Sequence, residues 1–543
     1  MLLTCEHIPQ RATLALHEGR NVDDTSDLAN LPTPGLQPAI VEHFGIDGLY
    51  GYRSISLTSK YAATVLIAKN GSGKTTLLGA LDAFLRGHFS RLTGIEFSSI
   101  RCRLRGVEDM LTLSKADIDE MSTIKPNSEL WVSAKTWEIE PPVLMDFLDN
   151  DYRNLDLRGL EDNSVFQTIF AKLGYSYPVF KANCDRLSAT LQGRNANIDA
   201  IRSTLKSVLA GVEIVYLPTY RRIELSLPNR ETRKGGRRIS IQAQLGIPRS
   251  GLYAGDIQFG LSDISDRLAA LHQEMLGQSN QGYGEISANI INDLITGAFE
   301  RGQPSLEQRP SKDALNVFFS RIKEGREEGP YRRGLYNYIQ IPDIEKIYSG
   351  EDISTESGKF LTYFLGKLNS VMQKTRTVEE SVEEFIRNCN RYLSGEDESV
   401  ALPNSKPSTE GAEDDKVLTF DRRNLRITVT SQSAKRKIPL DSLSSGEKQM
   451  ISLFARLYLY PLKKIVLIDE PELSLSIDWQ RKILPDILKS PSCSQIIAIT
   501  HSPFVFDNEL EPFATSLRLS FDAAAAPGLF SENDADDGAE FHE

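Results

Sequence analysis

The sequence has no apolar run of about 18 residues, the length that a membrane-spanning helix requires. Its N-terminus, MLLTCEHIPQ, lacks the basic segment and apolar core of a secretory signal. The five cysteines are scattered and show no spacing typical of a metal site or a set of disulfides. These absences argue against a membrane or secreted protein, and they indicate a cytoplasmic protein with no membrane partner.

A general excess of positive charge is also missing, since the formal net charge is −12. This balance argues against a surface coated in nucleic acid, but it does not exclude a local basic groove. One basic cluster consists of Arg221, Arg222, Arg230, Arg233, Lys234, Arg237 and Arg238. The cluster could line such a groove, or it could be a solvated loop. No heptad pattern is sustained over four or more repeats, so a long coiled-coil arm is not expected.

The chain is organised around the glycine-rich stretch 68–75, which reads Ala-Lys-Asn-Gly-Ser-Gly-Lys-Thr. An apolar run at 62–67 precedes it and an apolar helical pattern at 76–86 follows it. Strand, glycine-rich turn and helix form the context of a phosphate-binding loop. Gly71 and Gly73 let successive backbone N–H groups point at an anion, and the N-terminus of the helix favours phosphate.

Two side chains at the end of this loop have predicted roles in nucleotide binding. Lys74 can reach the β- and γ-phosphates, and the Thr75 hydroxyl can ligate Mg²⁺. The first position of the G-x-x-x-x-G-K-[ST] pattern is Ala68, and we expect the loop to tolerate this change because alanine suits a residue still on the strand. The alternative, a glycine-rich turn with a chance lysine, is disfavoured by the flanking strand and helix.

At 543 residues the chain can form about two to four domains. Residue alternation predicts antiparallel strands at 40–46 and 52–57, and further strands at 95–104 and 130–134. Helical spacing covers 166–209 with an interruption near 175–178, and an apolar strand follows at 212–217. Further along, helices are predicted at 261–275, 285–299 and 359–392, a polar linker at 402–416, and a hairpin at 417–420 and 425–429.

The C-terminal quarter contains a serine-glycine segment at 443–449 that enters a helix. Its free N–H groups could bind an anion, although for such a segment alone an ordinary N-cap with Glu447 in the first turn is the more usual explanation. The buried strand 465–468 then ends in Asp469 and Glu470. Asp469 would hold Mg²⁺ or its water, and Glu470 would point to the other side of the strand and face the attacking water.

A third motif is the buried strand 495–499, which ends in Thr500 and His501. His501 could hydrogen-bond the γ-phosphate, although a lone histidine after a strand is more often structural. Here His501 comes fourth along the chain, after the glycine-rich loop, the serine-glycine segment and the acidic strand end. This order favours a functional role for the histidine.

Together, the four motifs resemble those of ATP-binding-cassette (ABC) ATPases, in particular the branch shared with chromosome-maintenance and double-strand-break repair ATPases. The resemblance implies an α/β P-loop NTPase with two lobes and a mostly helical insertion. The expected domains are an N-terminal extension (1–37), lobe I (38–222), the insertion with its linker (223–416), lobe II (417–510) and an acidic tail (511–543).

The same resemblance implies a site for ATP and Mg²⁺ that is completed by a second protomer, so that a homodimer or higher oligomer sandwiches two nucleotides. The implied nucleotide-binding residues are Asn70, Gly71, Ser72, Gly73, Lys74, Thr75 and Thr76, with Ser445, Gly446 and Glu447 from the other protomer. The implied catalytic residues are Glu470 and His501, and the implied metal ligands are Thr75, Asp469 and Gln258.

Three segments look like a narrower group, the AAA family ATPases of bacterial anti-phage defence systems: 216–222, 470–475 and 500–503. They resemble the ATPases of Septu, of retron-associated Septu-like systems and of PARIS, and the overcoming-lysogenization and Gabija ATPases share the core. The resemblance implies a separate effector, a nuclease, with phage DNA or retron DNA and its reverse transcriptase as further candidate partners. Because little sequence follows His501, we expect no nuclease activity in this polypeptide.

A DNA-repair or recombination ATPase that clamps DNA is the alternative hypothesis. The net charge and the missing coiled coil count against it. A transport ATPase is a third option, disfavoured because nothing here would dock a membrane partner.

Overall fold

The computed structural model describes residues 35–69, 71–154, 160, 163–218, 261–297, 309–327, 343–349, 355–394, 416–431, 435–439, 442–473 and 475–521. The chain divides into two compact units, one formed by 1–257 with 462–543 and the other by 258–461. The predicted lobe II, 417–510, is therefore not one compact body, because its part up to residue 461 clusters with the predicted insertion. Asn70, Gln258 and the basic cluster at 221–238 lie outside the described residues.

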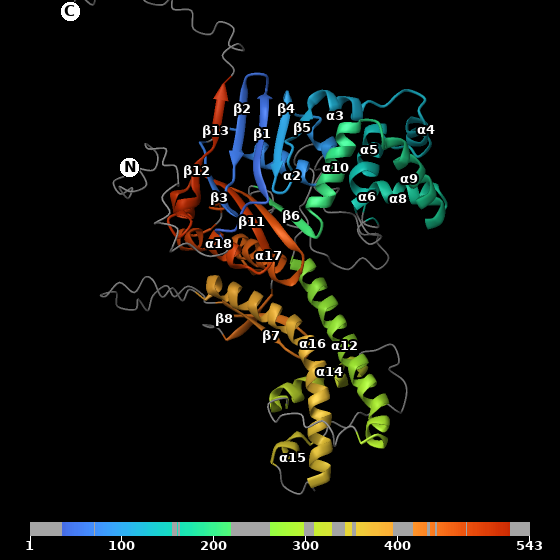
Figure 1. Ribbon diagram of the computed structural model, residues 1–543, viewed down its shortest axis with the longest axis vertical. Coiled ribbons are helices and arrows are strands. Elements are labelled where there is room, and N and C mark those ends of the chain that lie inside the picture. Colours follow the sequence, from blue (N-terminus) through green and yellow to red (C-terminus); the bar gives the residue numbers. More distant parts are fainter. Residues whose placement is uncertain are drawn as a thin grey trace, which may run out of the picture. The chain divides into compact units, whose positions relative to one another are not determined.

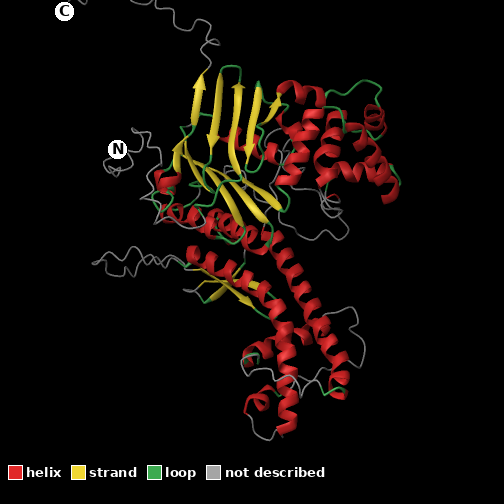
Figure 2. Cartoon of the chain, viewed as in Figure 1, coloured by secondary structure: helices red, strands yellow, loops and turns green. Residues whose placement is uncertain are grey.

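The first unit contains a parallel sheet with the strand order β12-β3-β11-β10-β6 (Figures 1 and 2). Its strands are β3 (Ala63–Ile67), β6 (Val212–Leu217), β10 (Lys463–Asp469), β11 (Cys493–Thr500) and β12 (Ala514–Ser516). The strands β10 and β11 are almost continuously apolar and buried, which is typical of a parallel sheet covered on both faces. Ile67 pairs with Thr500, and Asp469 pairs with Ile499. The carboxyl ends of β3, β10 and β11 thus lie at one sheet edge.

A second, antiparallel sheet in this unit has the order β13-β2-β1-β4-β5. Its strands are β1 (Val41–Leu49), β2 (Arg53–Thr58), β4 (Ser99–Leu104), β5 (Leu111–Ser114) and β13 (Arg518–Phe521). Gln495 of β11 connects the two sheets, because its amide accepts hydrogen bonds from the N–H groups of Ile40 and Val41 at 2.9 and 2.8 Å and donates one to the Val41 carbonyl at 3.0 Å.

The helix α2 (Lys74–Leu85) follows the glycine-rich loop and is buried on nearly every side. It packs against β1, β6 and β10, with Leu77, Leu78 and Leu81 in the core. Near its end, the fully buried Asp82 accepts hydrogen bonds from Arg86 at 2.6 Å and Arg91 at 2.8 Å. Burial acts to raise the pKa of Asp82, but the two guanidinium groups outweigh burial and lower it.

The segment between β5 and β6 is helical and has its own apolar core around Phe166, Phe180 and Leu187 (Figure 1). Its elements, with the short turn before β4, are η2 (Phe89–Leu92), α3 (Lys115–Ser122), α4 (Glu129–Thr136), α5 (Pro141–Asp146), η3 (Phe147–Asp151), α6 (Tyr152–Asn154), α8 (Ser164–Lys172), α9 (Tyr177–Leu191) and α10 (Ala196–Val208). The predicted strand at 130–134 is wrong, because these residues form α4. Ser128 caps that helix, and Leu130 and Ala134, four residues apart, are buried on one face.

After β10 the chain forms α18 (Ile477–Lys489), which packs on β11, and later the short turns η7 (Pro503–Val505) and η8 (Glu511–Phe513). The Ser476 hydroxyl caps α18 by accepting a hydrogen bond from the Trp479 N–H. The α18 helix thereby holds the segment that follows the acidic pair against the parallel sheet.

The second unit is formed by α12 (Leu261–Ile295), α14 (Lys312–Glu327), α15 (Ile344–Ser349), α16 (Thr355–Leu393), β7 (Lys416–Asp421), β8 (Arg426–Ser431), β9 (Arg436–Ile438) and α17 (Ser445–Leu459). The predicted hairpin is confirmed as β7 and β8, which pair antiparallel. The two helices predicted at 261–275 and 285–299 are wrong in one respect, because α12 is a single helix through this region.

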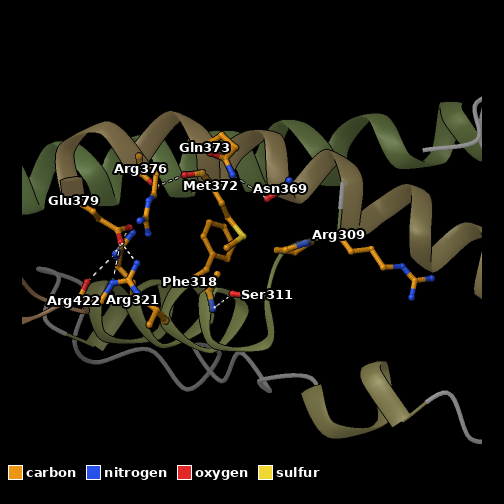
Figure 3. A pocket seen from close by; sticks show the side chains of 14 residues that line it. Arg309, Ser311, Phe318, Arg321, Asn369, Met372, Gln373, Arg376, Glu379 and Arg422 are labelled. Atoms are coloured by element: carbon orange, nitrogen blue, oxygen red, sulfur yellow. Dashed lines mark hydrogen bonds and ion pairs between the residues drawn. The ribbon is translucent and has the colours of Figure 1, made fainter. Parts of the chain in front are cut away.

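A cavity of about 280 Å³ in this unit is lined by α14, α16 and the turn between β7 and β8 (Figure 3). Arg321 is buried and pairs with Glu379 at 2.9 Å, and Arg422 pairs with the same carboxylate at 2.7 Å. Arg376, which also lines the cavity, pairs with Glu380 at 2.9 Å. A third carboxylate, Glu383, lies 3.6 Å from Arg422 and 3.9 Å from Arg376. The positive charge of the three arginines is therefore compensated, and the ion pairs tie the three elements together.

No helix in the described part of the chain is long and apolar enough to cross a membrane.

Candidate nucleotide site

The glycine-rich loop has the backbone conformation that its sequence predicts. Gly71 and Gly73 have φ of 78° and 92°, in the left-handed region that favours glycine. Gly73 immediately precedes α2, and that helix has no side-chain cap and no acidic residue in its first turn. No side chain of this turn therefore caps the first N–H groups of α2, and the turn itself carries no carboxylate, which suits an anion.

Two further features of the loop fit a phosphate group. The Ser72 hydroxyl is buried and makes no hydrogen bond within the described residues, which leaves it available to a ligand. Thr76 is buried in the first turn of α2. Arg53 of β2, which the sequence analysis missed, donates a hydrogen bond to the Gly71 carbonyl at 3.0 Å and thereby braces the loop. Its guanidinium lies over the ring of Tyr50, 5.2 Å from the centroid.

The loop lysine is already paired with one of the predicted catalytic residues. Lys74 Nζ lies 2.7 Å from Glu470 Oε1, with side chains that are 6% and 18% exposed. Glu470 has left the strand, because β10 ends at Asp469 and Glu470 has a left-handed φ of 53°. The expectation that Glu470 lies across the strand from Asp469 therefore does not apply, since strand alternation ends before Glu470.

The neighbouring contact joins the two predicted metal ligands. Thr75 Oγ1 donates a hydrogen bond to Asp469 Oδ2 at 2.5 Å, and Asp469 is fully buried. A hydroxyl and a carboxylate oxygen at this separation match the chemistry of Mg²⁺, which takes oxygen ligands and usually only one or two protein carboxylates. The third predicted ligand, Gln258, is not among the described residues.

His501 lies beside these groups at the end of β11. Its Nδ1 is 2.9 Å from Glu472 Oε1 and 3.8 Å from Glu470 Oε1. Glu472 is a second residue that the sequence analysis missed as part of the site. The available signal was a third carboxylate in the run Asp469-Glu470-Pro471-Glu472, all close to the end of one buried strand.

The serine-glycine segment belongs to the second unit and begins α17. The Ser444 hydroxyl accepts a hydrogen bond from the Glu447 N–H at 3.3 Å, and the Glu447 carboxylate accepts one from the Ser444 N–H at 2.7 Å. Lys416 also contacts Glu447, at 2.9 Å. The capping interpretation of Glu447 is therefore correct. Ser445 is exposed at the helix start, and Gly446 is buried.

The structure thus brings Lys74, Thr75, Asp469, Glu470 and His501 to one edge of the parallel sheet. Ser445, Gly446 and Glu447 belong to the other compact unit.

Comparison with known families gives one match. Residues 293–507 match the family described as "AAA domain, putative AbiEii toxin, Type IV TA system". The match covers about two fifths of the chain and includes α17, β10 and His501, but it begins after the glycine-rich loop. No curated protein matches the chain. The match supports a P-loop ATPase domain of the AAA type in this mixed α/β protein.

Proposed function

We propose that this protein is an ABC-type ATPase that works in a bacterial anti-phage defence complex in the cytoplasm. It binds and hydrolyses ATP and thereby regulates and scaffolds a separate effector subunit, a nuclease. The observation that carries the ATPase proposal is the cluster in which Lys74 and Thr75 of the loop meet Asp469 and Glu470 of β10.

Each of these side chains suits one part of phosphoryl transfer. Lys74 would bind the β- and γ-phosphate oxygens, and Thr75 with Asp469 would hold Mg²⁺, which neutralises charge on the phosphates when it is bound. Glu470 would release Lys74 and orient the attacking water, and His501 would contact the γ-phosphate.

A second protomer completes the proposed site through the start of α17, where Ser445 and Gly446 would contact the nucleotide bound to the first protomer. Two observations support this step: Ser445 is exposed, and the bonds between Ser444 and Glu447 fix the first turn of the helix. A rigid helix N-terminus with an exposed hydroxyl is suited to a phosphate.

Light scattering with gel filtration tests the nucleotide sandwich. Glu470→Gln with ATP and Mg²⁺ should form a stable dimer or higher oligomer that is absent without ATP. Ser445→Arg in the Glu470→Gln background should abolish that assembly, because a bulky cation would occupy the phosphate position. Ser442→Arg, an exposed residue just before the helix, is the matched control and should not. Equal assembly in all three proteins would contradict the sandwich.

The defence role rests on the resemblance in segments 216–222, 470–475 and 500–503. The matched family's description names a toxin of a type IV toxin–antitoxin system as a putative member. Purified protein incubated with DNA and RNA tests the division of labour. We expect no cleavage. Cleavage that persists in Lys74→Ala would show that the nuclease resides in this chain.

The same purified protein can be used to test the alternative hypothesis, an ATPase that clamps DNA. A gel shift of linear double-stranded DNA that appears only with ATP would favour a clamp over a defence regulator.

A further inference from the structure

Glu472 is a buried carboxylate whose partners lie at the end of a neighbouring strand. Its side chain is 6% exposed. The oxygen Oε2 accepts a hydrogen bond from Thr500 Oγ1 at 2.8 Å. The oxygen Oε1 accepts one from the His501 backbone N–H at 3.1 Å and lies 2.9 Å from His501 Nδ1. The carboxylate therefore contacts both the backbone and the ring of one residue of the proposed catalytic group.

We propose that Glu472 is a positioning residue that fixes the ring orientation and the tautomer of His501. An ionised carboxylate can only accept hydrogen bonds, so Nδ1 of His501 must carry the proton at their 2.9 Å contact. Nε2 is then the ring nitrogen that remains available to the nucleotide or to water. This inference deepens the proposed function, since it assigns how His501 is prepared for ATP hydrolysis.

A second set of bonds argues that Glu472 does more than anchor its own turn. Gln480 of α18 donates hydrogen bonds to the carbonyls of Glu472 at 3.2 Å and Leu475 at 3.1 Å. The Gln480 amide oxygen also accepts a hydrogen bond from Ser502 Oγ at 2.9 Å. The backbone of this turn is therefore already joined to the end of β11 through a neutral side chain.

Burial of a charged group is costly unless it is well hydrogen-bonded, so a carboxylate is a poor choice for a purely structural anchor. A neutral side chain could fill the same space with less desolvation. The charge becomes useful where it aligns a histidine, because the hydrogen bond of one ring nitrogen determines the state of the other.

Histidine-selective ¹⁵N NMR tests the tautomer without depending on ATP turnover. The His501→Asn variant assigns the His501 signals among those of the seven histidines. In the wild type, neutral His501 should be protonated at Nδ1. In Glu472→Met, which offers no oxygen to Nδ1–H, the population protonated at Nε2, the form that an unconstrained histidine prefers, should become the major form. Gln480→Ala is the matched control, and it should leave the tautomer unchanged because it loosens the turn without touching the ring.

Two NMR outcomes would overturn the proposal. One is an Nε2-protonated His501 in the wild type, and the other is a His501 spectrum that is the same in the wild type and in Glu472→Met. Thermal melts of each variant check that the fold is retained, and Thr500→Val provides a second perturbation. It removes one partner of Glu472 but keeps both His501 contacts, so it should preserve the Nδ1-protonated form.

Steady-state kinetics then tests the link to hydrolysis. Loss of a side chain that orients a functional histidine typically costs about 10–100-fold, so kcat of Glu472→Met should fall by that factor while KM changes by less than about threefold. In a His501→Asn background the same substitution should have little further effect on kcat. An equal loss in both backgrounds would show that Glu472 does not act through His501. If the protein hydrolyses no ATP at all, the proposed function fails, whereas the NMR result still decides the role of Glu472.

Discussion

Replacement of Glu470 by glutamine should change nucleotide affinity as well as turnover, because Glu470 occupies Lys74 when no nucleotide is bound. The two side chains are 2.7 Å apart, and both are mostly buried. A γ-phosphate that binds Lys74 Nζ must displace the Glu470 carboxylate or share the ammonium group with it. Glu470 therefore competes with the phosphate for the lysine, and its negative charge also repels the incoming nucleotide.

The size of the effect follows from the change in the hydrogen bond. A bond between charged partners contributes about 1.5–3 kcal/mol, and one to a neutral amide contributes less, so Glu470→Gln weakens the competing contact by about 1–1.5 kcal/mol. Since 1.4 kcal/mol is tenfold in an equilibrium constant, the Kd for ATP should fall by about tenfold. Loss of the group that orients water should lower kcat by about 10²–10⁴-fold.

Equilibrium titration with a fluorescent, non-hydrolysable ATP analogue measures the affinity free of turnover. Glu213→Gln is the matched control, because Glu213 of β6 lies 3.7 Å from the buried Lys464 and has a similar exposure of 20%. That control should leave the Kd unchanged. A Kd that is equal or higher in Glu470→Gln would show that the pair with Lys74 does not compete with the nucleotide. A kcat equal to that of the wild type would remove Glu470 from the catalytic role.

Three other substitutions have expected outcomes. Lys74→Ala should raise the Kd for ATP by about 10–100-fold in calorimetric titrations, because a charge-assisted phosphate contact of about 1.5–3 kcal/mol is lost. Asp82→Asn should lower the free energy of unfolding by about 3–5 kcal/mol in urea, since one partner of a buried ion pair is removed. The contribution of Asp82 is present at neutral pH and is lost as the pH falls through its lowered pKa. Burial, with Arg86 and Arg91, lowers the pKa of His88 to about 3. Between pH 6.5 and about 3 the unfolded chain therefore binds more protons at His88, and stability falls on acidification by up to about 1.4 kcal/mol per pH unit. His88→Gln should reduce that slope, and an unchanged slope would contradict the assignment.

The main contacts of the site could be anticipated because parallel strands end at the same sheet edge. The glycine-rich loop follows β3, Asp469 ends β10 and His501 follows β11, so a single topological rule brings them together. The pair between Lys74 and Glu470 was not predictable in this way. The residues are assigned to phosphate and to water when nucleotide is present, and sequence motifs carry no information on which groups pair without it.

The failures have local physical causes. The run 130–134 is too short to separate a period of 2 from a period of 3.6, and the helix-capping signal of Ser128 decides the question in favour of α4. The segment between the two helices predicted at 261–275 and 285–299 contains Gly277, Gly282 and Gly284. A Cβ on Gly282 would come within 2.5 Å of Val371 Cγ1, so this glycine allows α16 to approach α12 closely and does not end the helix.

The roles of Glu472 and Gln495 illustrate why buried polar residues next to apolar strands need explanation. Gln495 is fully buried in β11 and bonds to backbone groups more than 450 residues away, and Glu472 reaches Thr500 and His501 on that same strand. Both residues lie within segments that the sequence analysis noted, 470–475 and 495–499, but neither was assigned a role of its own. Each is nonetheless a polar side chain where the surrounding pattern calls for an apolar one, and burial without partners would cost about 1–3 kcal/mol. The sheet order places β11 between β3 and β10, so a carboxylate just beyond β10 that must find donors has the end of β11 as its neighbour. The end of β11 is also where His501 lies, and the same requirement that satisfies Glu472 therefore aligns the histidine.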